Sequence, residues 1–254
     1  MINHTAITTR FGSYLPSIKA SRKAGLDYAI TEGAAVLGGA DITFSSGFGY
    51  ALWAVDFNLA AMARGVSRVT NLAGRPDAKR VFWTPDDSGG EASPGPHARA
   101  PFPAAMFVAD FVGTEKEDVA VKEIDVGEDL ASAYAMYDAE KGSLKRVALV
   151  NLRLYNGTEE GERGEATFSL SVGEGVESVK VRSLHAELGV AAMGYDFGGK
   201  DHVVSWAGEQ WSHDLDGGNG HLIKRKVDEK TVEVKDGVAS VKVLDSEAVM
   251  VLVE

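Results

Sequence analysis

The chain has 254 residues, of which 44% are hydrophobic, so it can bury the core of one large domain or of two modest ones. Its formal net charge of −11 argues against nucleic acid and anionic membranes as partners, because both would be repelled. The sequence contains no cysteine, which excludes disulfides, thiolate zinc sites and cysteine nucleophiles.

The charge is distributed unevenly along the chain. Residues 1–110 contain 10 Lys and Arg against 9 Asp and Glu, whereas residues 111–254 contain 16 against 28. A change of this kind predicts a boundary near residue 105. The first residues lack the apolar segment of a signal peptide, and the longest apolar stretch is interrupted by Asp56 and is too short to span a bilayer. We therefore expect no membrane association, and the compartment stays unknown.

The first third of the chain predicts alternating helices and strands. The segment "SYLPSIKASRKAGLDYAIT", residues 13–31, indicates a helix with Pro16 in its first turn and then a short buried strand. After a Gly-rich stretch, "GYALWAVDFNLAAMARG" predicts an amphipathic helix with Tyr50, Trp53 and Phe57 on its apolar face. The segment "VSRVTNL" predicts a second strand, and this order is typical of parallel sheets in α/β proteins.

The remainder of the chain changes period. Residues 74–103 hold six of the seven prolines and predict a long irregular connection. From about residue 104, nine segments alternate in apolarity or are rich in Val, and turn signals such as Asn156-Gly157 separate them. This pattern is typical of an antiparallel β-sandwich. We expect two domains, residues 1–103 and 104–254, in a chain that is mainly β.

The α/β part is too small to be self-contained. Two strands and two helices cannot close a barrel or form a doubly wound sheet, and the strand edges would be left unpaired. We therefore expect that an N-terminal half is missing from this part.

Glu32 is the leading candidate for chemistry, because it ends the apolar run of "AITEGAAVLGG", residues 29–39. Barrel enzymes place catalytic groups at the C-terminal ends of parallel strands, and carboxylate pairs there hydrolyse glycosidic bonds. A solvated glutamate at a strand end is the alternative, and position alone favours it.

Aromatic residues offer candidates for a sugar-binding cleft. Phe44 and Trp83 fall in predicted loops, where substrate contact and core packing are about equally consistent with the sequence. Trp53 lies on a predicted helix, where core packing is the better interpretation.

Metal and cofactor sites are not expected. The segment "WSHDLDGGNGH", residues 211–221, is dense in oxygen and nitrogen ligands, but its spacing fits no motif and a Gly-rich hairpin turn explains it equally well. The glycine stretches fit neither GxxxxGK[ST] nor GxGxxG, so we expect no phosphate loop and no cofactor. Asn3 and Asn156 begin N-glycosylation sequons, which matter only in a secreted protein.

Several segments together resemble the fungal and bacterial β-glucuronidases of glycoside hydrolase family 79, a group related to heparanase. They are "NHTAI", "GLDYAITEGAAVLGG", "SSGFGYALWAVDFNLAAMARGVSRV", "FWTPDD", "VVSWAGEQW" and the terminal "EAVMVLVE". The resemblance implies a (β/α)8 barrel followed by a β-sandwich, and retaining hydrolysis of β-glucuronides by two glutamates. Glu32 falls at the nucleophile position that it implies, so residues 1–103 are expected to be a partial barrel.

Two features depart from the family pattern. The acid/base glutamate of the family follows an Asn far upstream, and this sequence has no Asn-Glu dipeptide. Gly33, Ala34 and Ala35 follow Glu32 where the family has polar side chains. Arg75 is a candidate for contact with an acidic sugar, although an exposed loop cation is an equal interpretation.

The sequence therefore leaves two functional hypotheses. The first is the C-terminal part of a retaining β-glucuronidase, inactive alone, whose partner is an acidic glycan or a glucuronide; the family is commonly secreted. The second is a non-catalytic carbohydrate-binding or interaction module in which the β-sandwich is the working domain.

Overall fold

The computed structural model describes residues 2–35, 44–45, 47–71, 82–84, 97–113, 118–194, 202–211 and 227–253. Its helices are α1 (His4–Arg10), the 3-10 helix η1 (Phe11–Ser13), α2 (Leu15–Lys23), α4 (Phe48–Ala63) and α5 (Pro101–Val112). Three of its strand pairs are short or lie outside the main sheet: β1 (Ala29–Gly33) with β2 (Arg68–Asn71), β3 (Trp83–Thr84) with β4 (His97–Ala98), and β10 (Val204–Trp206) with β11 (Glu209–Gln210). The long strands are β5 (Val119–Ile124), β6 (Ala131–Asp138), β7 (Leu144–Asn151), β8 (Glu165–Ser171), β9 (Ser178–Ala186), β12 (Lys230–Lys235), β13 (Val238–Leu244) and β14 (Glu247–Leu252).

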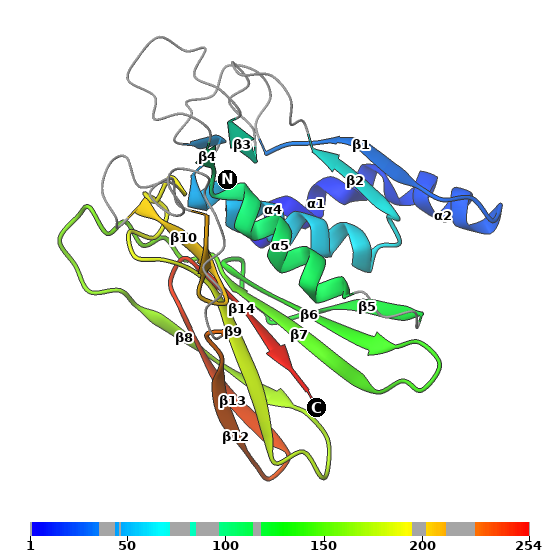
Figure 1. The fold of residues 1–254 in the computed structure, drawn as a ribbon. Helices are drawn as coiled ribbons and strands as arrows, with labels where there is room; N and C mark the ends of the chain where they lie inside the picture. Colours follow the sequence, from blue (N-terminus) through cyan, green and yellow to red (C-terminus); the bar gives the residue numbers. More distant parts are fainter. Residues whose placement is uncertain are drawn as a thin grey trace.

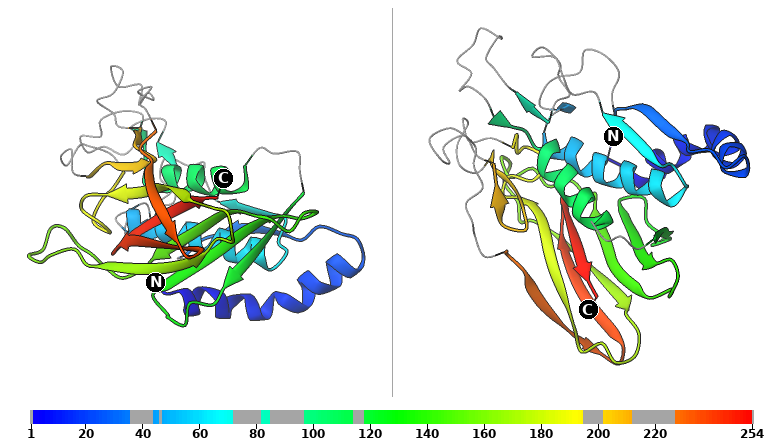
Figure 2. Two further views of the ribbon diagram at one scale, coloured as in Figure 1. Left: turned by 90° about the horizontal axis from the view of Figure 1, so that it is seen from below. Right: turned by 45° about the vertical axis from the view of Figure 1, so that its right-hand side comes forward.

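One antiparallel sheet dominates the C-terminal part. Its strands follow the order β5-β6-β7-β14-β9-β12-β13-β8, and β10 and β11 attach beside β9, which gives ten strands. Figures 1 and 2 show that the sheet curls, so that β8, β12 and β13 lie across from β6, β7 and β14. The prediction of a mainly β chain with an antiparallel C-terminal part is therefore confirmed.

The middle strands of this sheet are buried on both faces. On β14, Ala248 and Met250 pack toward the helices, whereas Val249 and Val251 pack into a second core between the two halves of the curled sheet. Successive side chains of a strand point to opposite faces, so each face needs its own apolar set. This double burial explains the unbroken apolar run "AVMVLV", residues 248–253, which lacks the polar alternation of a half-exposed strand.

The helix α4 packs against the sheet and against α5 (Figure 1). Eleven of its 16 residues are buried, including Trp53, so the predicted core role of Trp53 is confirmed. The expectation of an amphipathic helix is wrong, because α4 has protein on most of its sides and its one acidic residue, Asp56, is fully buried. The apolar face predicted for it does exist, as Tyr50, Trp53 and Phe57 form a continuous stack of rings.

Two helices were not anticipated from the sequence. The first is α1, and the second is α5, which runs across the predicted boundary at residues 103 and 104 and packs on α4. The division of the chain into residues 1–103 and 104–254 stays a prediction.

The strands β1 and β2 form a separate parallel pair, as predicted for the first third of the chain. In Figures 1 and 2 both strands run toward the side of the molecule where β3 and β4 lie. Among the described residues, β1 pairs with β2 alone. Within the same described part of the chain, no helix is long and apolar enough to cross a membrane.

Candidate functional site

Glu32 lies near the C-terminal end of β1, in an irregular part of the β1–β2 pair. Ile30 pairs with Val69 and Gly33 pairs with Asn71, so two residues of β1, Thr31 and Glu32, face a single intervening residue of β2. An extra residue of this kind is a β-bulge, which re-aims side chains and occurs often beside active sites. Both bulged residues are exposed, and no hydrogen bond or ion pair joins the Glu32 carboxylate to another described residue.

Gly33 explains why a small residue must follow Glu32. A Cβ on Gly33 would lie 2.8 Å from Val69 Cγ1, 3.3 Å from Asn71 Oδ1 and 3.4 Å from Phe57 Cε1. The missing side chain lets β1 approach β2 and α4 closely. The glycine that departs from the polar pattern of the family is thus a packing requirement in this chain.

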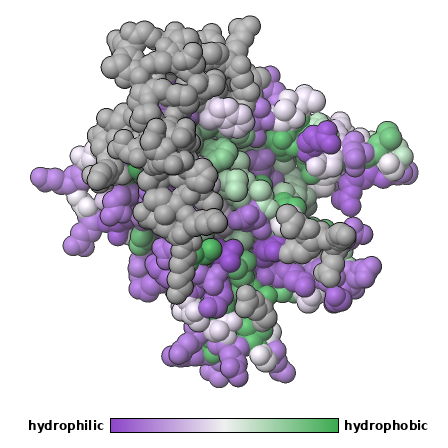
Figure 3. Space-filling model, viewed as in Figure 1, coloured by the Kyte–Doolittle hydropathy of each residue, from purple (hydrophilic) through white to green (hydrophobic). Residues whose placement is uncertain are grey.

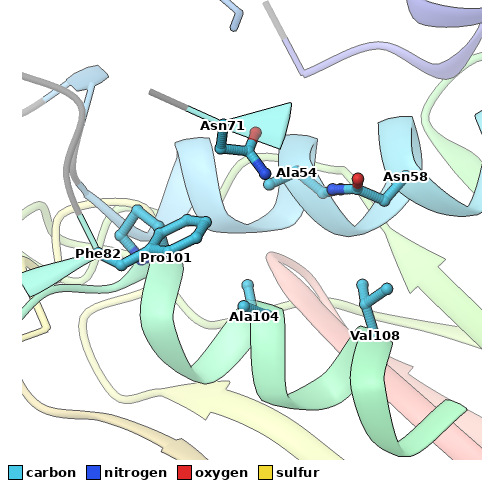
Figure 4. A pocket seen from close by; sticks show the side chains of 8 residues that line it. Ala54, Asn58, Asn71, Phe82, Pro101, Ala104 and Val108 are labelled. Atoms are coloured by element: carbon cyan, nitrogen blue, oxygen red, sulfur yellow. The ribbon is translucent and has the colours of Figure 1, made fainter. Parts of the chain in front are cut away.

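A small cavity lies beside the end of β2, between α4 and α5 (Figure 4). Its volume is about 150 Å³, and its lining is Ala54, Asn58, Asn71, Phe82, Pro101, Ala104, Ala105 and Val108. Asn58 Nδ2 donates a hydrogen bond to the Ala54 carbonyl at 2.6 Å, whereas Asn71 Oδ1 is buried without a hydrogen-bond partner. The volume is below the roughly 300–1,000 Å³ of typical ligand pockets, so this cavity suits water rather than a sugar.

Phe44 and Trp83 are both exposed, as a binding role requires. Phe44 is 61% exposed and borders a second, mainly apolar cavity of about 380 Å³ between the start of α4 and the loops after β7 and β9. Trp83 is 52% exposed on β3. Neither Glu32 nor Trp83 lines either of these two cavities, so the three candidates do not share one of them.

Other sequence-derived candidates lie outside the described residues. These are Arg75 and the ligand-rich residues after Trp211. Among the residues that the structure describes, no three His, Asp or Glu side chains come together as a set of cation ligands.

The strongest electrostatic cluster lies at the junction between the helices and the sheet, and sequence reasoning did not find it. His4 Nδ1 lies 3.0 Å from Asp56 Oδ1, and His4 Nε2 lies 3.5 Å from Glu123 Oε1. Tyr134 Oη also donates to the Asp56 carboxylate, and Arg64 pairs with Glu123. We call these five residues, His4, Asp56, Arg64, Glu123 and Tyr134, the junction network.

Burial and pairing compete in setting the pKa values of the junction network. For His4, burial lowers the pKa, but the hydrogen bonds to Asp56 and Glu123 outweigh it and raise the pKa to about 9. For Glu123, burial raises the pKa, but His4 and Arg64 together lower it to about 2. Burial raises the pKa of Tyr134 well above its usual value, so its hydroxyl keeps the proton that it donates. These charges bind one another across α1, α4, β5 and β6, which indicates a structural role rather than a catalytic one.

One signal for the junction network was present in the sequence. Asp56 is the single charged residue of a mainly apolar helix, and a buried carboxylate needs hydrogen-bond partners. Its partners are 52 and 78 residues away along the chain, so no local pattern could identify them.

Comparisons with known proteins agree on the family of the C-terminal part. Residues 133–250 match the model of the glycosyl hydrolase family 79 C-terminal beta domain. A beta-glucuronidase of Aspergillus niger is 27% identical over 216 residues, which cover 80% of this chain and 37% of that protein. A beta-glucuronidase of Neurospora crassa is 28% identical over 204 residues, which cover 68% of this chain and 34% of that protein.

The fold has a close counterpart among solved structures. The crystal structure of a 4-O-alpha-L-rhamnosyl-beta-D-glucuronidase from Fusarium oxysporum matches 99% of this chain with a TM-score of 0.77 and 19% identity, over 49% of its own length. This chain thus spans about a third of the length of the curated relatives and about half of that solved chain. Residues 133–250 belong to the C-terminal beta domain of glycoside hydrolase family 79, and the resemblance noted in the sequence is confirmed.

Proposed function

We propose that this chain is the nucleophile-bearing part of a retaining glycosidase that acts on β-glucuronides. The observation that carries the proposal is the position of Glu32, an exposed carboxylate in a bulge near the C-terminal end of a parallel strand. The beta-glucuronidases among its relatives supply the substrate class.

In this proposal, β1 and β2 are two neighbouring strands of a barrel. Gly33 packs toward α4, as a residue on the outer face of a barrel strand would, and the exposed Thr31 and Glu32 would then face the barrel interior. The cavity between α4 and α5 would lie in the outer, helical layer, which fits the lack of Glu32 in its lining.

Retaining hydrolysis needs two carboxyl groups about 5–5.5 Å apart. Glu32 would attack the anomeric carbon, while a second carboxylic acid protonates the oxygen of the leaving group. Water then hydrolyses the glycosyl–enzyme intermediate with the help of the same second group. The sequence has no Asn-Glu dipeptide, which the family resemblance implies for the acid/base, so we propose that this second group comes from sequence outside these 254 residues.

The proposal predicts that the isolated chain is inactive. Loss of the general acid alone removes about 10²–10⁴-fold of the rate, and a barrel without its other strands would not hold the sugar. Phe44, Trp83 and Arg75 are proposed as substrate contacts in the complete site.

A hydrolysis assay tests the proposal in two steps. The purified chain, mixed with an aryl β-glucuronide, should show no turnover above that of its Glu32→Gln variant. When the upstream region of the Aspergillus niger relative is joined to the chain, turnover should appear and should be abolished by Glu32→Gln. The matched control is Glu174→Gln, which changes an exposed glutamate in a distant turn. Turnover by the isolated chain would contradict its inactivity, and turnover of the joined protein that survives Glu32→Gln would contradict the role of Glu32.

The exposed Phe44 and Trp83 also favour a second function, a non-catalytic carbohydrate-binding module. Affinity electrophoresis in gels that contain acidic polysaccharide separates the two functions. Retardation that survives Glu32→Gln but is weakened by Phe44→Ala and Trp83→Ala, together with no turnover by the joined protein, would favour the binding module. Turnover by the joined protein would favour the glycosidase.

A further inference from the structure

Three aromatic side chains from separate segments meet on the surface of the molecule. Trp83 comes from β3, Phe102 from the first turn of α5, and Trp211 directly follows β11. The ring centroids of Trp83 and Phe102 lie 6.3 Å apart at 87°, and those of Phe102 and Trp211 lie 5.1 Å apart at 82°. We call these three residues the aromatic row.

The aromatic row is only partly buried. Trp83 is more than half exposed, and Phe102 and Trp211 are each partly exposed. Trp206 provides the contrast, because it is buried, packs on Phe107 and donates from Nε1 to Asp110 Oδ2 at 2.7 Å. The chain therefore places one tryptophan of the β10–β11 hairpin inside the protein and leaves the next one, Trp211, at the surface.

Hydrogen bonds, ring packing and strand pairing hold the three residues of the aromatic row in place. Trp206 fixes β10 to α5 through Asp110, and so it holds Trp211 close to Phe102 on the same helix. On the other side, Trp83 pairs with Ala98, and the Arg99 amide donates to the Phe82 carbonyl at 2.8 Å. Binding sites built on supported elements lose little conformational entropy when a ligand binds.

The apolar, uncharged rings indicate which kind of ligand the aromatic row would bind. Exposed aromatic rings offer flat apolar faces, and the face of a pyranose ring that carries axial hydrogens is its apolar counterpart. Nucleobases also stack on aromatic rings, but the net charge of −11 opposes a phosphate backbone. The three rings are uncharged, so the row itself offers no cation to the carboxylate of an acidic sugar.

The row lies on the side of the molecule toward which β1 and β2 run, since Trp83 is part of the β3–β4 pair (Figures 1 and 2). In the face drawn in Figure 3, apolar residues gather in the upper middle of the described surface, over the helical part, whereas the sheet below is largely hydrophilic. A glycan chain lying near the end of β1 would therefore find its apolar contacts on this side.

We propose that the aromatic row binds a neutral pyranose unit of a glycan, separate from the glucuronosyl unit that would meet Glu32. This inference rests on the proposed function for its ligand class, and it adds Phe102 and Trp211 to the candidate contacts. It assigns the row to the part of the substrate beyond the bond that is cleaved.

Binding without hydrolysis tests the row directly. Affinity electrophoresis of the full chain should show retardation by a neutral polysaccharide such as a β-glucan or a galactan, and weaker retardation by polyglucuronate. Trp83→Ala and Trp211→Ala should each weaken the binding roughly threefold to tenfold, which corresponds to the loss of one aromatic contact. Trp83→Tyr should retain most of it. The control Tyr14→Ala removes another exposed aromatic ring, next to α2, and should change nothing.

The outcomes separate this inference from the proposed function. Retardation that persists in Glu32→Gln and is weakened in Trp83→Ala supports the row, whether or not Glu32 proves to be a nucleophile. The proposal for the aromatic row would be overturned if no neutral polysaccharide retarded the protein, or if Tyr14→Ala weakened the binding as much as Trp83→Ala does. Neither result would affect the hydrolysis test of Glu32. Stronger retardation by polyglucuronate than by neutral glycans would overturn the choice of a neutral sugar. Because Trp83 is half exposed, its variants should fold, and circular dichroism checks this for each protein.

Discussion

Two carboxylates in this chain have opposite surroundings. Asp56 is fully buried at the junction of the helices and the sheet, where His4 and Tyr134 bind it. Glu32 is exposed near the end of β1, and no described residue pairs with it. The first carboxylate has the partners that a buried charge needs, whereas the second has none among the described residues.

We propose that Asp56 serves the stability of the fold and that Glu32 serves function. Buried charges are tolerated only when they are paired and hydrogen-bonded, and the junction network meets this condition within the chain itself. An exposed carboxylate on a two-stranded parallel pair contributes little to stability, because water solvates it. We infer that the junction and the sheet form a self-sufficient unit, and that the β1–β2 surface carries a group whose use depends on other parts of a larger site.

The largest effect is expected from breaking the junction network. Asp56→Ala would leave the His4 cation and the Tyr134 hydroxyl without their shared acceptor, and we expect the free energy of unfolding to fall by roughly 3–5 kcal/mol. Urea denaturation measures this change. Asp27→Ala removes an exposed aspartate and should alter stability by less than about 0.5 kcal/mol. Equal effects of the two substitutions would contradict the structural role of Asp56.

The pH dependence of stability gives the next largest effect. The pKa of His4 is raised from 6.5 to about 9, so its contribution is fully present below pH 6.5 and is lost as the pH rises to 9. The pKa of Glu123 is lowered from 4.5 to about 2, so its contribution is present above pH 4.5 and is lost as the pH falls toward 2. We expect the greatest stability between pH 4.5 and 6.5, and a decrease on the order of 3 kcal/mol by pH 9. Chemical denaturation at several pH values should show this decrease, and His4→Gln should flatten it; an unchanged slope in the variant would assign the decrease to other groups.

A smaller effect is expected where β1 approaches α4. In Gly33→Ala the new methyl group would meet Val69 Cγ1 at 2.8 Å, and we expect a loss of roughly 1–3 kcal/mol from this crowding. Gly12→Ala is the matched control, because no heavy atom lies within 4 Å of its new methyl group. Thermal unfolding of the two variants should differ clearly, and a Gly33→Ala protein as stable as the Gly12→Ala protein would contradict the close approach.

The smallest effect is expected at Glu32 itself. Glu32→Gln removes an exposed charge without a described partner, so the free energy of unfolding should change by no more than about 0.5 kcal/mol. A loss near that of Asp56→Ala would show that Glu32 supports the fold, and the comparison between the two carboxylates would fail.

Local sequence patterns predicted most of the elements but few of the contacts between them. The period of two identified the strands from Val119 to Leu252, and Gly65 marked the end of α4. The helix α5 was missed because Pro101 and Pro103 were assigned to an irregular connection, although proline is common in a first helical turn. The sequence could not predict that Trp206 is buried and that Trp211 is partly exposed, because both depend on where α5 packs.

The candidate site was predicted in outline only. The strand before Glu32 and its parallel partner followed from the alternation of helix and strand, but the bulge and the steric reason for Gly33 depend on the register with β2. The exposure of Phe44 and Trp83 argues against full burial in the core, one of the two interpretations that their positions in predicted loops had left open. Their roles in binding, and that of Arg75, stay predictions.

Native-state hydrogen exchange tests the central difference between the two regions most directly. The amides of β14, such as that of Met250, lie between two strands in the middle of the curled sheet and should exchange only by global unfolding. The amides of β1, such as that of Ile30, belong to a two-stranded pair and should exchange faster by local opening. Equal protection of Ile30 and Met250 would contradict the account, because the β1–β2 surface would then be as self-sufficient as the sheet.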